Sequence, residues 1–249
     1  PPVLHEPLQQ QLVRLGLRGA ADALARLACR DEVVDTLAVL LEAECLHRDS
    51  LAQARRLKLA RLGQSAHPAD VDLRTPRSLG KSRWQQLVSL NWFKQHQHVL
   101  LVGPTGIGKS YLACALAKAV VDQKKSVRYL RLPRLGEELT ALQAQGRVGQ
   151  WLKAMGRIDL IILDDFGLVP MPAHHQPLLL ELLEDRQQRG SVLVTSQLPI
   201  KLWHGQFQDP TLADAVLDRL VHNAETIELS GESMRKKKHA EATSSPPAE

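Results

Sequence analysis

The first quarter of the chain has apolar residues at the spacing of amphipathic helices. Leucine and alanine recur every three or four positions from residue 7 to 28, and glycines at 16 and 19 weaken the middle of this stretch. A longer helix is predicted over 31–62, because Asp31 can cap its first turn and an apolar stripe follows. The stripe consists of Val33, Val34, Leu37, Leu40 and Leu41. It predicts packing within the chain, and the alternative is an interface with a partner.

The rest of the chain begins with the composition of a linker, and a pattern of alternating strands and helices follows. Residues 63–82 are rich in proline, glycine and polar side chains, which is typical of a linker. Beyond them, strands are predicted at 99–102, 127–132, 160–163 and 191–197, with helical patterns between and after them. This alternation predicts an α/β fold in which helices pack on a largely parallel sheet. The expected parts are an N-terminal helical domain at 1–62, a linker at 63–82, the α/β core at 83–235 and a disordered basic and polar tail at 236–249.

The stretch VLLVGPTGIGKSYLA, residues 99–113, passes from an apolar run through glycines into a helical pattern. Within it, GPTGIGKS has the spacing of a phosphate-binding loop, whose glycines let backbone N–H groups point at a phosphate chain. In such a loop Lys109 reaches the β- and γ-phosphates and Ser110 is a ligand of Mg²⁺. The alternative is a glycine-rich turn with a chance lysine. The residues predicted to bind the nucleotide, ATP or GTP, are Gly103, Pro104, Thr105, Gly106, Ile107, Gly108, Lys109, Ser110 and Tyr111.

Acidic residues follow a second apolar run in LIILDDFG, residues 160–167. A buried strand that ends in acid predicts that Asp164 is a ligand of Mg²⁺ or of its water shell. Asp165 is then placed to orient or deprotonate the attacking water, so Lys109, Asp164 and Asp165 are the predicted catalytic residues. Asp165 stands where glutamate is usual in ATPases, and its shorter side chain makes the water role less certain than the metal role. Alternatively, the two aspartates only end a strand and begin a turn.

The strand predicted at 191–197, SVLVTSQ, ends in hydroxyl and amide side chains. Phosphate-loop ATPases with an additional strand between the loop and the acidic strand, which this order of elements resembles, have a sensor of the γ-phosphate here. Thr195, Ser196 and Gln197 could sense the nucleotide by hydrogen bonding, and Gln197 is predicted to bind it although asparagine is commoner at this place. The alternative is an ordinary buried strand end.

The charge of the chain favours an anionic partner. The chain has 249 residues and a net charge of +5, and its basic residues concentrate at 48–61 and 235–238. Aromatic residues make up 4%, too few for the stacking platforms of single-strand binders, so phosphate contacts to duplex DNA are favoured. Arg55, Arg56 and Lys58 are the predicted DNA contacts, and the alternative is a solvated helix face.

Composition also indicates the cellular compartment in which the protein is expected. The three cysteines, at 29, 45 and 114, are far apart and match no zinc-ligand spacing, which predicts buried thiols in a reducing compartment. No run approaches the roughly 20 apolar residues of a membrane span, and the first residues lack the order of a signal peptide. A cytoplasmic protein with no membrane partner is therefore expected. The histidine pairs at 96/98 and 174/175 are expected to be surface or loop residues and not metal ligands.

Together these segments resemble the IstB-like ATP-binding proteins, AAA+ ATPases that help the transposases of bacterial insertion sequences and are related to DnaC-type helicase loaders. The resemblance covers nearly the whole chain and includes GPTGIGKS, LIILDDFG, TSQLPIKLWH and GESMRKK. It implies an AAA+ type P-loop core with ATP and Mg²⁺ as cofactors. It also implies that Arg219 is an arginine finger for a neighbouring subunit and that Arg235 is a second sensor within its own subunit. Either arginine could instead be an ordinary surface or salt-bridge residue.

The resemblance further implies what the protein does. Subunits would assemble with ATP into a homo-oligomer on duplex target DNA, largely independently of base sequence, recruit or stimulate a transposase, and reset on ATP hydrolysis. One alternative is a helicase loader, which would bind a replicative helicase. A small-molecule kinase would need an acceptor pocket and a lid. A DNA-binding protein with an inactive nucleotide site is disfavoured because Lys109, Asp164 and Asp165 are all present.

Overall fold

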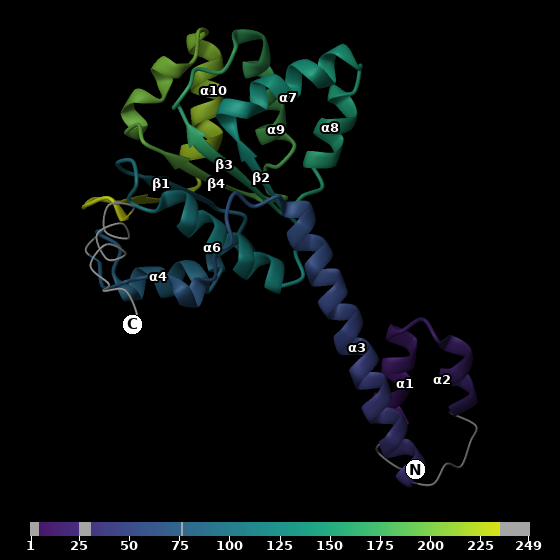
Figure 1. Ribbon diagram of the computed structural model, residues 1–249. Coiled ribbons are helices and arrows are strands. Elements are labelled where there is room, and N and C mark those ends of the chain that lie inside the picture. Colours follow the sequence, from purple (N-terminus) through teal and green to yellow (C-terminus); the bar gives the residue numbers. More distant parts are fainter. Residues whose placement is uncertain (1–4, 25–30, 76, 235–249) are drawn as a thin grey trace, which may run out of the picture. The chain divides into compact units, whose positions relative to one another are not determined.

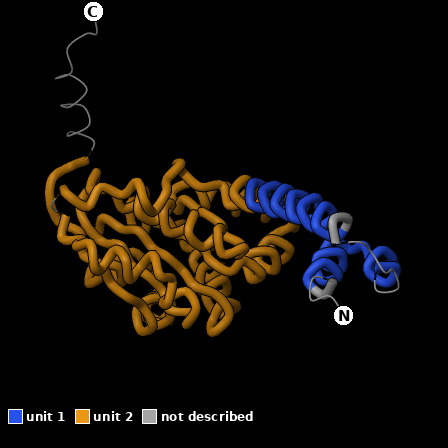
Figure 2. The backbone as a smooth tube through the Cα atoms, turned by 90° about the horizontal axis from the view of Figure 1, so that it is seen from below, with its two compact units in different colours: residues 1–55 blue, residues 56–249 orange. Residues whose placement is uncertain are grey.

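The computed structural model describes residues 5–24, 31–75 and 77–234, which belong to two compact units. Unit 1 comprises residues 1–55 and unit 2 comprises residues 56–249 (Figure 2). The division falls within the long helix α3, Asp31–Ala60. The domain limits expected at residues 62, 82 and 235 stay predictions, because contacts alone do not show which segments fold independently.

Unit 1 is helical, and its helices α1 (His5–Arg14) and α2 (Arg18–Leu24) are joined by a turn at Gly16, whose φ is +78°. Such a φ suits glycine, which explains the break between the two short helices. An ion pair of 2.5 Å joins Arg14 Nη2 to Asp49 Oδ2 on α3. The residues of the small apolar core are Leu8, Leu12, Ala21, Leu24 and Val34, with Ala38 and Leu41 against them.

Only part of the predicted apolar stripe on α3 is covered. Val34 is 1% exposed and Leu41 packs on the same core, whereas Leu37 is 38% and Leu40 is 61% exposed. The core-facing positions 34, 38 and 41 are four and three residues apart, so they form one narrow helix face. Leu37 and Leu40 fall outside this face, and the prediction that they pack within the chain is wrong.

Unit 2 contains a parallel sheet of five strands in the order β2-β3-β4-β1-β5. The strands are β1 (His98–Val102), β2 (Val127–Arg131), β3 (Leu160–Phe166), β4 (Ser191–Ser196) and β5 (Ala224–Glu228). The predicted α/β class is thereby confirmed. Because all strands are parallel, their carboxyl ends meet along one edge, where the phosphate loop and the LIILDDFG acids also lie.

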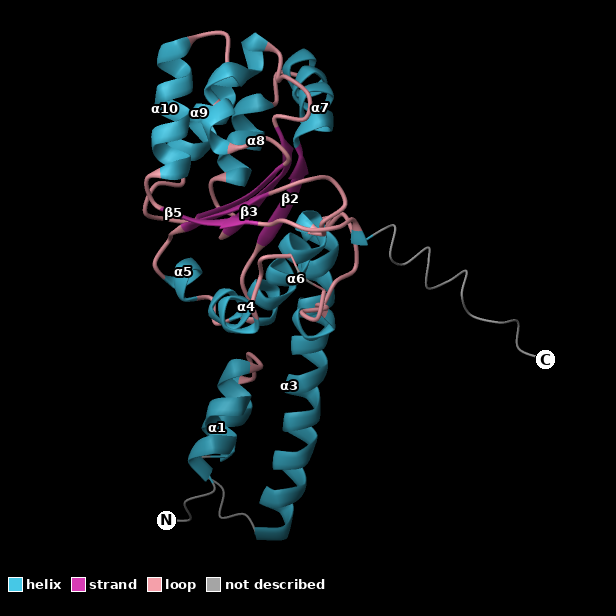
Figure 3. Ribbon diagram, turned by 90° about the vertical axis from the view of Figure 1, so that its left-hand side faces the viewer, coloured by secondary structure: helices cyan, strands magenta, loops and turns pink. Residues whose placement is uncertain are grey.

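Helices cover both faces of this sheet (Figures 1 and 3). On one face lie α4 (Lys81–Val88), α5 (Asn91–Lys94) and α6 (Lys109–Asp122). On the other face lie α7 (Leu132–Ala144), α8 (Val148–Met155), α9 (Gln176–Glu184) and α10 (Pro210–Val221). Short 3-10 turns stand at Pro68–Asp70, Ala173–His175, Ile200–Leu202 and His204–Gln206. The apolar side chains of the strands form a separate core with each helical layer.

The segment expected to be a linker, 63–82, is packed within unit 2. Its Val71 and Leu79 are buried and share the core that contains α6, and Trp84 Nε1 donates to the carbonyl of Pro68 at 3.2 Å. The segment therefore contributes side chains to the α/β unit, although its composition is that of a linker.

The buried thiols Cys45 and Cys114 agree with expectation, and Cys29 lies outside the described residues. The histidine prediction needs correction. His98 and His175 are buried, whereas the other histidines of the two pairs, His96 and His174, are exposed. His98 begins β1, and its Nδ1 accepts a hydrogen bond of 3.1 Å from the N–H of Val192 on β4. Burial lowers the pKa of His98 to about 4, so this imidazole is neutral at pH 7 and serves as a structural acceptor.

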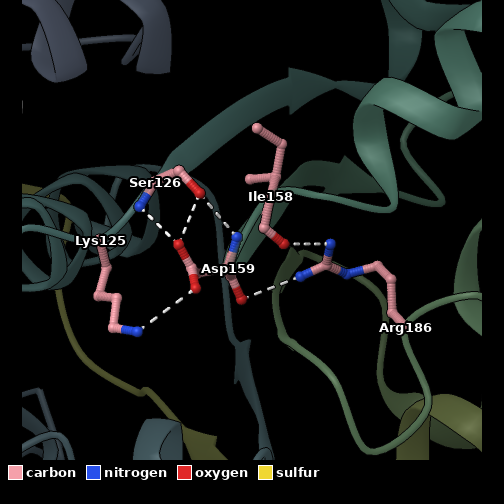
Figure 4. Close-up of polar contacts among 5 residues, drawn as sticks. All are labelled: Lys125, Ser126, Ile158, Asp159 and Arg186. Atoms are coloured by element: carbon pink, nitrogen blue, oxygen red, sulfur yellow. Dashed lines mark hydrogen bonds and ion pairs between the residues drawn. The ribbon is translucent and has the colours of Figure 1, made fainter.

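A buried arginine ties together the amino ends of the central strands (Figure 4). Arg186 is 1% exposed, and burial lowers its pKa to about 10, so it keeps its charge at neutral pH. Its Nη1 and Nη2 donate to four carbonyls at 2.6 to 3.1 Å, those of Met155, Ile158, Asp159 and Ser191. The Asp159 carboxylate accepts from the N–H and the hydroxyl of Ser126 at 2.8 and 2.6 Å, which fixes the start of β2 to that of β3.

Replacing Arg186 by methionine is expected to lower the free energy of unfolding by about 3 kcal/mol or more, since four carbonyls lose the charged guanidinium as a donor. The measurement is urea denaturation followed by the tryptophan signal. Arg189→Met is the matched control, because Arg189 is exposed in the same turn and should change stability by less than about 0.5 kcal/mol. Equal stability of the two variants would contradict the structural role of Arg186.

Candidate functional site

The phosphate loop lies between β1 and α6 and is held by the segment that follows β5. Gly106 has a φ of +82°, and a Cβ there would lie 2.3 Å from Ser233 Oγ. At Gly103 a Cβ would lie 2.3 Å from the carbonyl oxygen of Leu229. The N–H of Met234 donates to the carbonyl of Gly106 at 2.9 Å. Glycine is thus required at Gly103 by the close approach of a backbone carbonyl, and at Gly106 by its positive φ and the nearby side chain of Ser233. The loop forms a cradle of backbone groups at the start of α6.

Lys109 lies folded against the loop. Its Nζ donates to the carbonyls of Gly103 and Pro104, each at 2.8 Å, and the residue is 7% exposed. Burial lowers its pKa, which the carboxylates of Asp165 and Asp164 oppose. The ammonium group therefore sits beside the loop and faces two acids, where an anionic ligand would gain most from its charge.

Asp164 lies at the centre of the site and accepts three hydroxyl hydrogens. Ser110 Oγ on α6 donates to its Oδ1 at 2.8 Å, and Thr195 Oγ1 on β4 donates to the same oxygen at 2.5 Å. The hydroxyl of Tyr129 on β2 donates to Oδ2, and burial together with this hydrogen bond raises the pKa of Tyr129. Asp164 is 2% exposed, so these donors stabilise a carboxylate that burial would otherwise disfavour.

Asp165 is in the left-handed region, with a φ of +61°, where the pairing of β3 with β4 is irregular. This conformation is rare for a residue with a side chain and is common at functional sites. Its N–H donates to Thr195 Oγ1 at 3.1 Å, and its Oδ2 accepts from Arg131 Nε at 2.9 Å. Sequence reasoning missed Arg131, because nothing in the β2 pattern marks this arginine as the partner of an acid one strand away.

The three polar residues that end β4 face different neighbours. Thr195 contacts the two aspartates, whereas Ser196 Oγ donates to the carbonyl of Phe166 at 2.7 Å. Gln197 Oε1 accepts from Thr105 Oγ1 of the phosphate loop at 2.5 Å. Thr195 and Gln197 therefore reach the site, and Ser196 is used to hold the strand end.

Two cavities open onto these residues. A cavity of about 230 Å³ is lined by the phosphate loop, by Tyr111, by Asp70, Asp72 and Arg77 of segment 63–82, and by Met234. A second cavity, of about 630 Å³, adjoins Ser110, Asp164, Asp165 and Gln197 and extends towards β2. Arg77 was not predicted: it is 2% exposed, its Nη2 donates to the carbonyl of Asp72, and its Nη1 lies 3.0 Å from where a Cβ on Gly108 would be.

The predicted basic residues lie elsewhere or outside the described residues. Arg219 on α10 donates from Nη2 to Glu184 Oε1 at 2.7 Å and lines neither cavity, so it does not complete the site of its own chain. Arg235 lies outside the described residues. On α3, Arg55 and Lys58 are exposed and Arg56 is half-buried.

Comparison with known proteins identifies the family. The model of the IstB-like ATP binding proteins matches residues 10–242. The chain belongs to this family. The Sinorhizobium fredii protein y4uH, whose name refers to an insertion sequence and to ATP binding, is 44% identical over 239 residues, which cover 94% of this chain and 96% of that protein. A Pseudomonas aeruginosa protein named for insertion sequence IS21 and for ATP binding is 31% identical over 206 residues, which cover 83% of this chain and 78% of that protein.

The fold of this IstB-like protein also has solved counterparts. The crystal structure of the DnaC helicase loader superposes with a TM-score of 0.56 at 16% identity, over 66% of this chain and 97% of that one. The likeness shows the fold, an AAA+ type P-loop domain. ATP is the ligand for which the family is named. In the parts of the chain that the structure describes, no helix is long and apolar enough to cross a membrane.

Gly106→Ala is expected to weaken ATP binding by about tenfold or more, because a Cβ there would lie 2.3 Å from Ser233 Oγ and 3.0 Å from Ser233 Cβ, so that Ser233 or the loop must shift. Binding is measured by calorimetry at fixed salt. Gly146→Ala is the matched control: Gly146 also has a positive φ, +63°, but open space around it and no place in the site. If both variants bind ATP alike, the close contact at Gly106 does not shape the site.

Proposed function

We propose that this IstB-like protein is an ATP-hydrolysing helper of transposition that assembles on duplex target DNA. The observation that carries the ATPase part is the gathering of Lys109, Ser110, Asp164 and Asp165 at one end of the sheet. A protein that only bound nucleotide would need the lysine and the loop, but not the second acid.

The residues present fit a metal-bound triphosphate. The glycines leave a cradle that side chains would fill, and the hydroxyl of Ser110 and the carboxylate of Asp164, 2.8 Å apart, are hard oxygen ligands. Ser110 and Asp164 would hold Mg²⁺, which neutralises charge on the phosphates when bound. Lys109 would bind the phosphate oxygens, and Asp165 would orient or deprotonate the attacking water. Gln197 would reach the nucleotide from the end of β4, next to Thr105.

The remaining residues would act between subunits and on DNA. Arg219 would reach the γ-phosphate of a neighbouring copy, which fits the observation that it lines neither cavity of its own chain. Arg235 would act in cis; it follows Met234, whose N–H donates to the phosphate loop. Arg55, Arg56 and Lys58 would contact DNA phosphates without reading bases. ATP binding would favour the assembled, DNA-bound state, which would recruit or stimulate a transposase, and hydrolysis would reset it.

The insertion-sequence names of the relatives support a transposase as the partner. The DnaC likeness, at 16% identity, supports only the fold, so loading of a helicase stays the second choice. A stable complex with a replicative helicase, and none with a transposase, would reverse this order.

The proposal is tested by the size and DNA affinity of assemblies formed on duplex DNA with ATP, with ADP and without nucleotide. The wild type should form large DNA-bound assemblies with ATP alone. Lys109→Ala should lose them because the phosphate chain loses its cation, and Asp165→Asn should prolong them because hydrolysis is slowed. Lys153→Ala, which changes an exposed lysine on α8, is the control and should behave as the wild type. Equal DNA binding with ATP, with ADP and without nucleotide in all of these proteins would contradict the proposed control of DNA binding by ATP.

A further inference from the structure

The smaller cavity contains a buried arginine that the ATPase roles above leave unused. Arg77 comes from segment 63–82, is 2% exposed and lines this cavity of about 230 Å³. Its Nη1 lies beside the phosphate loop, 3.0 Å from where a Cβ on Gly108 would be. Gly108 is the N-cap of α6, whose first N–H groups lack partners within the helix. The guanidinium group therefore stands next to the backbone donors that begin α6.

The hydrogen-bonding groups of Arg77 are used only in part by the described residues. A guanidinium group carries several N–H donors in one plane. Among the described atoms, Nη2 of Arg77 donates to the carbonyl of Asp72, and its buried Nε has no partner. Arg186, which is equally buried, donates instead to four carbonyls. Buried donors are normally paired, so Arg77 has the pattern of a side chain that awaits a further acceptor.

The positive charge of Arg77 is also only partly balanced. Burial lowers the pKa of Arg77, and the nearby charge of Asp72 opposes this effect. Both oxygens of the Asp72 carboxylate accept hydrogen bonds from other groups. Oδ1 accepts from the N–H of Arg74 at 2.8 Å, and Oδ2 accepts from the hydroxyl of Thr75 at 2.6 Å. A buried cation whose counter-charge is shared in this way favours an anionic acceptor over a neutral one.

The linings of the two cavities indicate which part of a nucleotide would lie near Arg77. Ser110, Asp165 and Gln197 are proposed to meet Mg²⁺, the attacking water and the nucleotide, and they line both cavities. Arg77 and Tyr111 line only the smaller cavity. A nucleotide whose γ-phosphate meets Asp165 would therefore extend its α-phosphate towards Arg77 and the first turn of α6.

We propose that Arg77 binds the α-phosphate of the nucleotide and is, beside Lys109, a second cation of the site. Lys109 Nζ lies against the carbonyls of Gly103 and Pro104 at the start of the loop, whereas Arg77 stands beside Gly108 at its end. The two cations thus serve different phosphates of the same chain. A planar guanidinium group offers paired N–H donors to phosphate oxygens. This role rests on the proposed function, from which it takes the place of the γ-phosphate, but it needs neither hydrolysis nor DNA.

The first test is calorimetry of ADP and ATP binding to the full chain with Mg²⁺, at one fixed salt concentration. Arg77→Gln should weaken the binding of both nucleotides by the same factor, about tenfold or more, because both carry the α-phosphate. Arg77→Lys keeps a cation and should restore part of this loss. Arg74→Gln is the matched control: it removes the same charge from an exposed arginine of the same segment and should bind as the wild type does.

Two results of this test would contradict different claims. Wild-type affinity of Arg77→Gln for both nucleotides would overturn the role of Arg77 while leaving the nucleotide site intact. A wild type that binds neither ADP nor ATP would contradict the nucleotide site itself, and with it the proposed function.

A second test separates contact with the α-phosphate from a structural role of Arg77 in holding segment 63–82. The probes are ADPαS and ADPβS, in which sulfur, a poor hydrogen-bond acceptor, replaces one oxygen of the α- or the β-phosphate. Affinities are measured in EDTA, so that the sulfur does not act through a metal ion. In the wild type, one diastereomer of ADPαS should bind about tenfold more weakly than ADP, because it loses a charge-assisted hydrogen bond. In Arg77→Gln this difference should disappear, whereas the effect of ADPβS should be the same in both proteins.

The sulfur effects decide between the two roles even if Arg77→Gln destabilises its segment. A purely structural role would weaken ADP and both analogues alike in Arg77→Gln. Equal effects of the α-sulfur in the wild type and in Arg77→Gln would therefore overturn the proposed contact. Loss of the β-sulfur effect in place of the α-sulfur effect would likewise overturn the assignment to the α-phosphate.

Discussion

The carboxylate of Asp164, buried and held by three hydroxyl groups, is the constraint on which the rest of the site depends. A charge that is 2% exposed needs donors, and Ser110, Thr195 and Tyr129 supply them from α6, β4 and β2. These elements can converge on one residue only if β3 lies between β2 and β4, which is the observed order. The order of the strands is therefore what allows the three hydroxyl groups to reach Asp164 at the edge of the sheet.

The phosphate loop depends on a second approach of the chain, from its C-terminal side. The N–H of Leu229 donates to the carbonyl of Val102 at 2.7 Å, and Met234 bonds the loop at Gly106. The edge strand β5 brings this segment into place, so the loop is closed by residues more than a hundred positions away. Glycine at 103 and 106 follows from this contact as much as from the phosphate chain itself.

Local motifs predicted the centre of the site, and long-range pairing decided the rest. GPTGIGKS and LIILDDFG predicted the loop, α6 and the acidic end of β3, because their signals lie within a few residues of one another. The strand β5, AETIE, was not predicted, since its short polar sequence becomes a strand only by pairing with β1. Arg131 and Arg77 were missed for a similar reason: each is defined by a partner on another segment. His98 was misjudged because a strand start and a loop look alike until the neighbouring strand supplies Val192.

The most direct test of the central claim is calorimetry of ATP binding to the wild type and to Asp164→Asn, each with Mg²⁺ and with EDTA. If Asp164 is the carboxylate that holds the metal, Mg²⁺ should tighten binding to the wild type, and the variant should lose this gain while keeping the wild-type affinity in EDTA. The EDTA measurement also shows whether the variant still folds its phosphate loop. A variant that keeps the full gain from Mg²⁺ would contradict the account, because the carboxylate at the centre of the site would then serve structure alone.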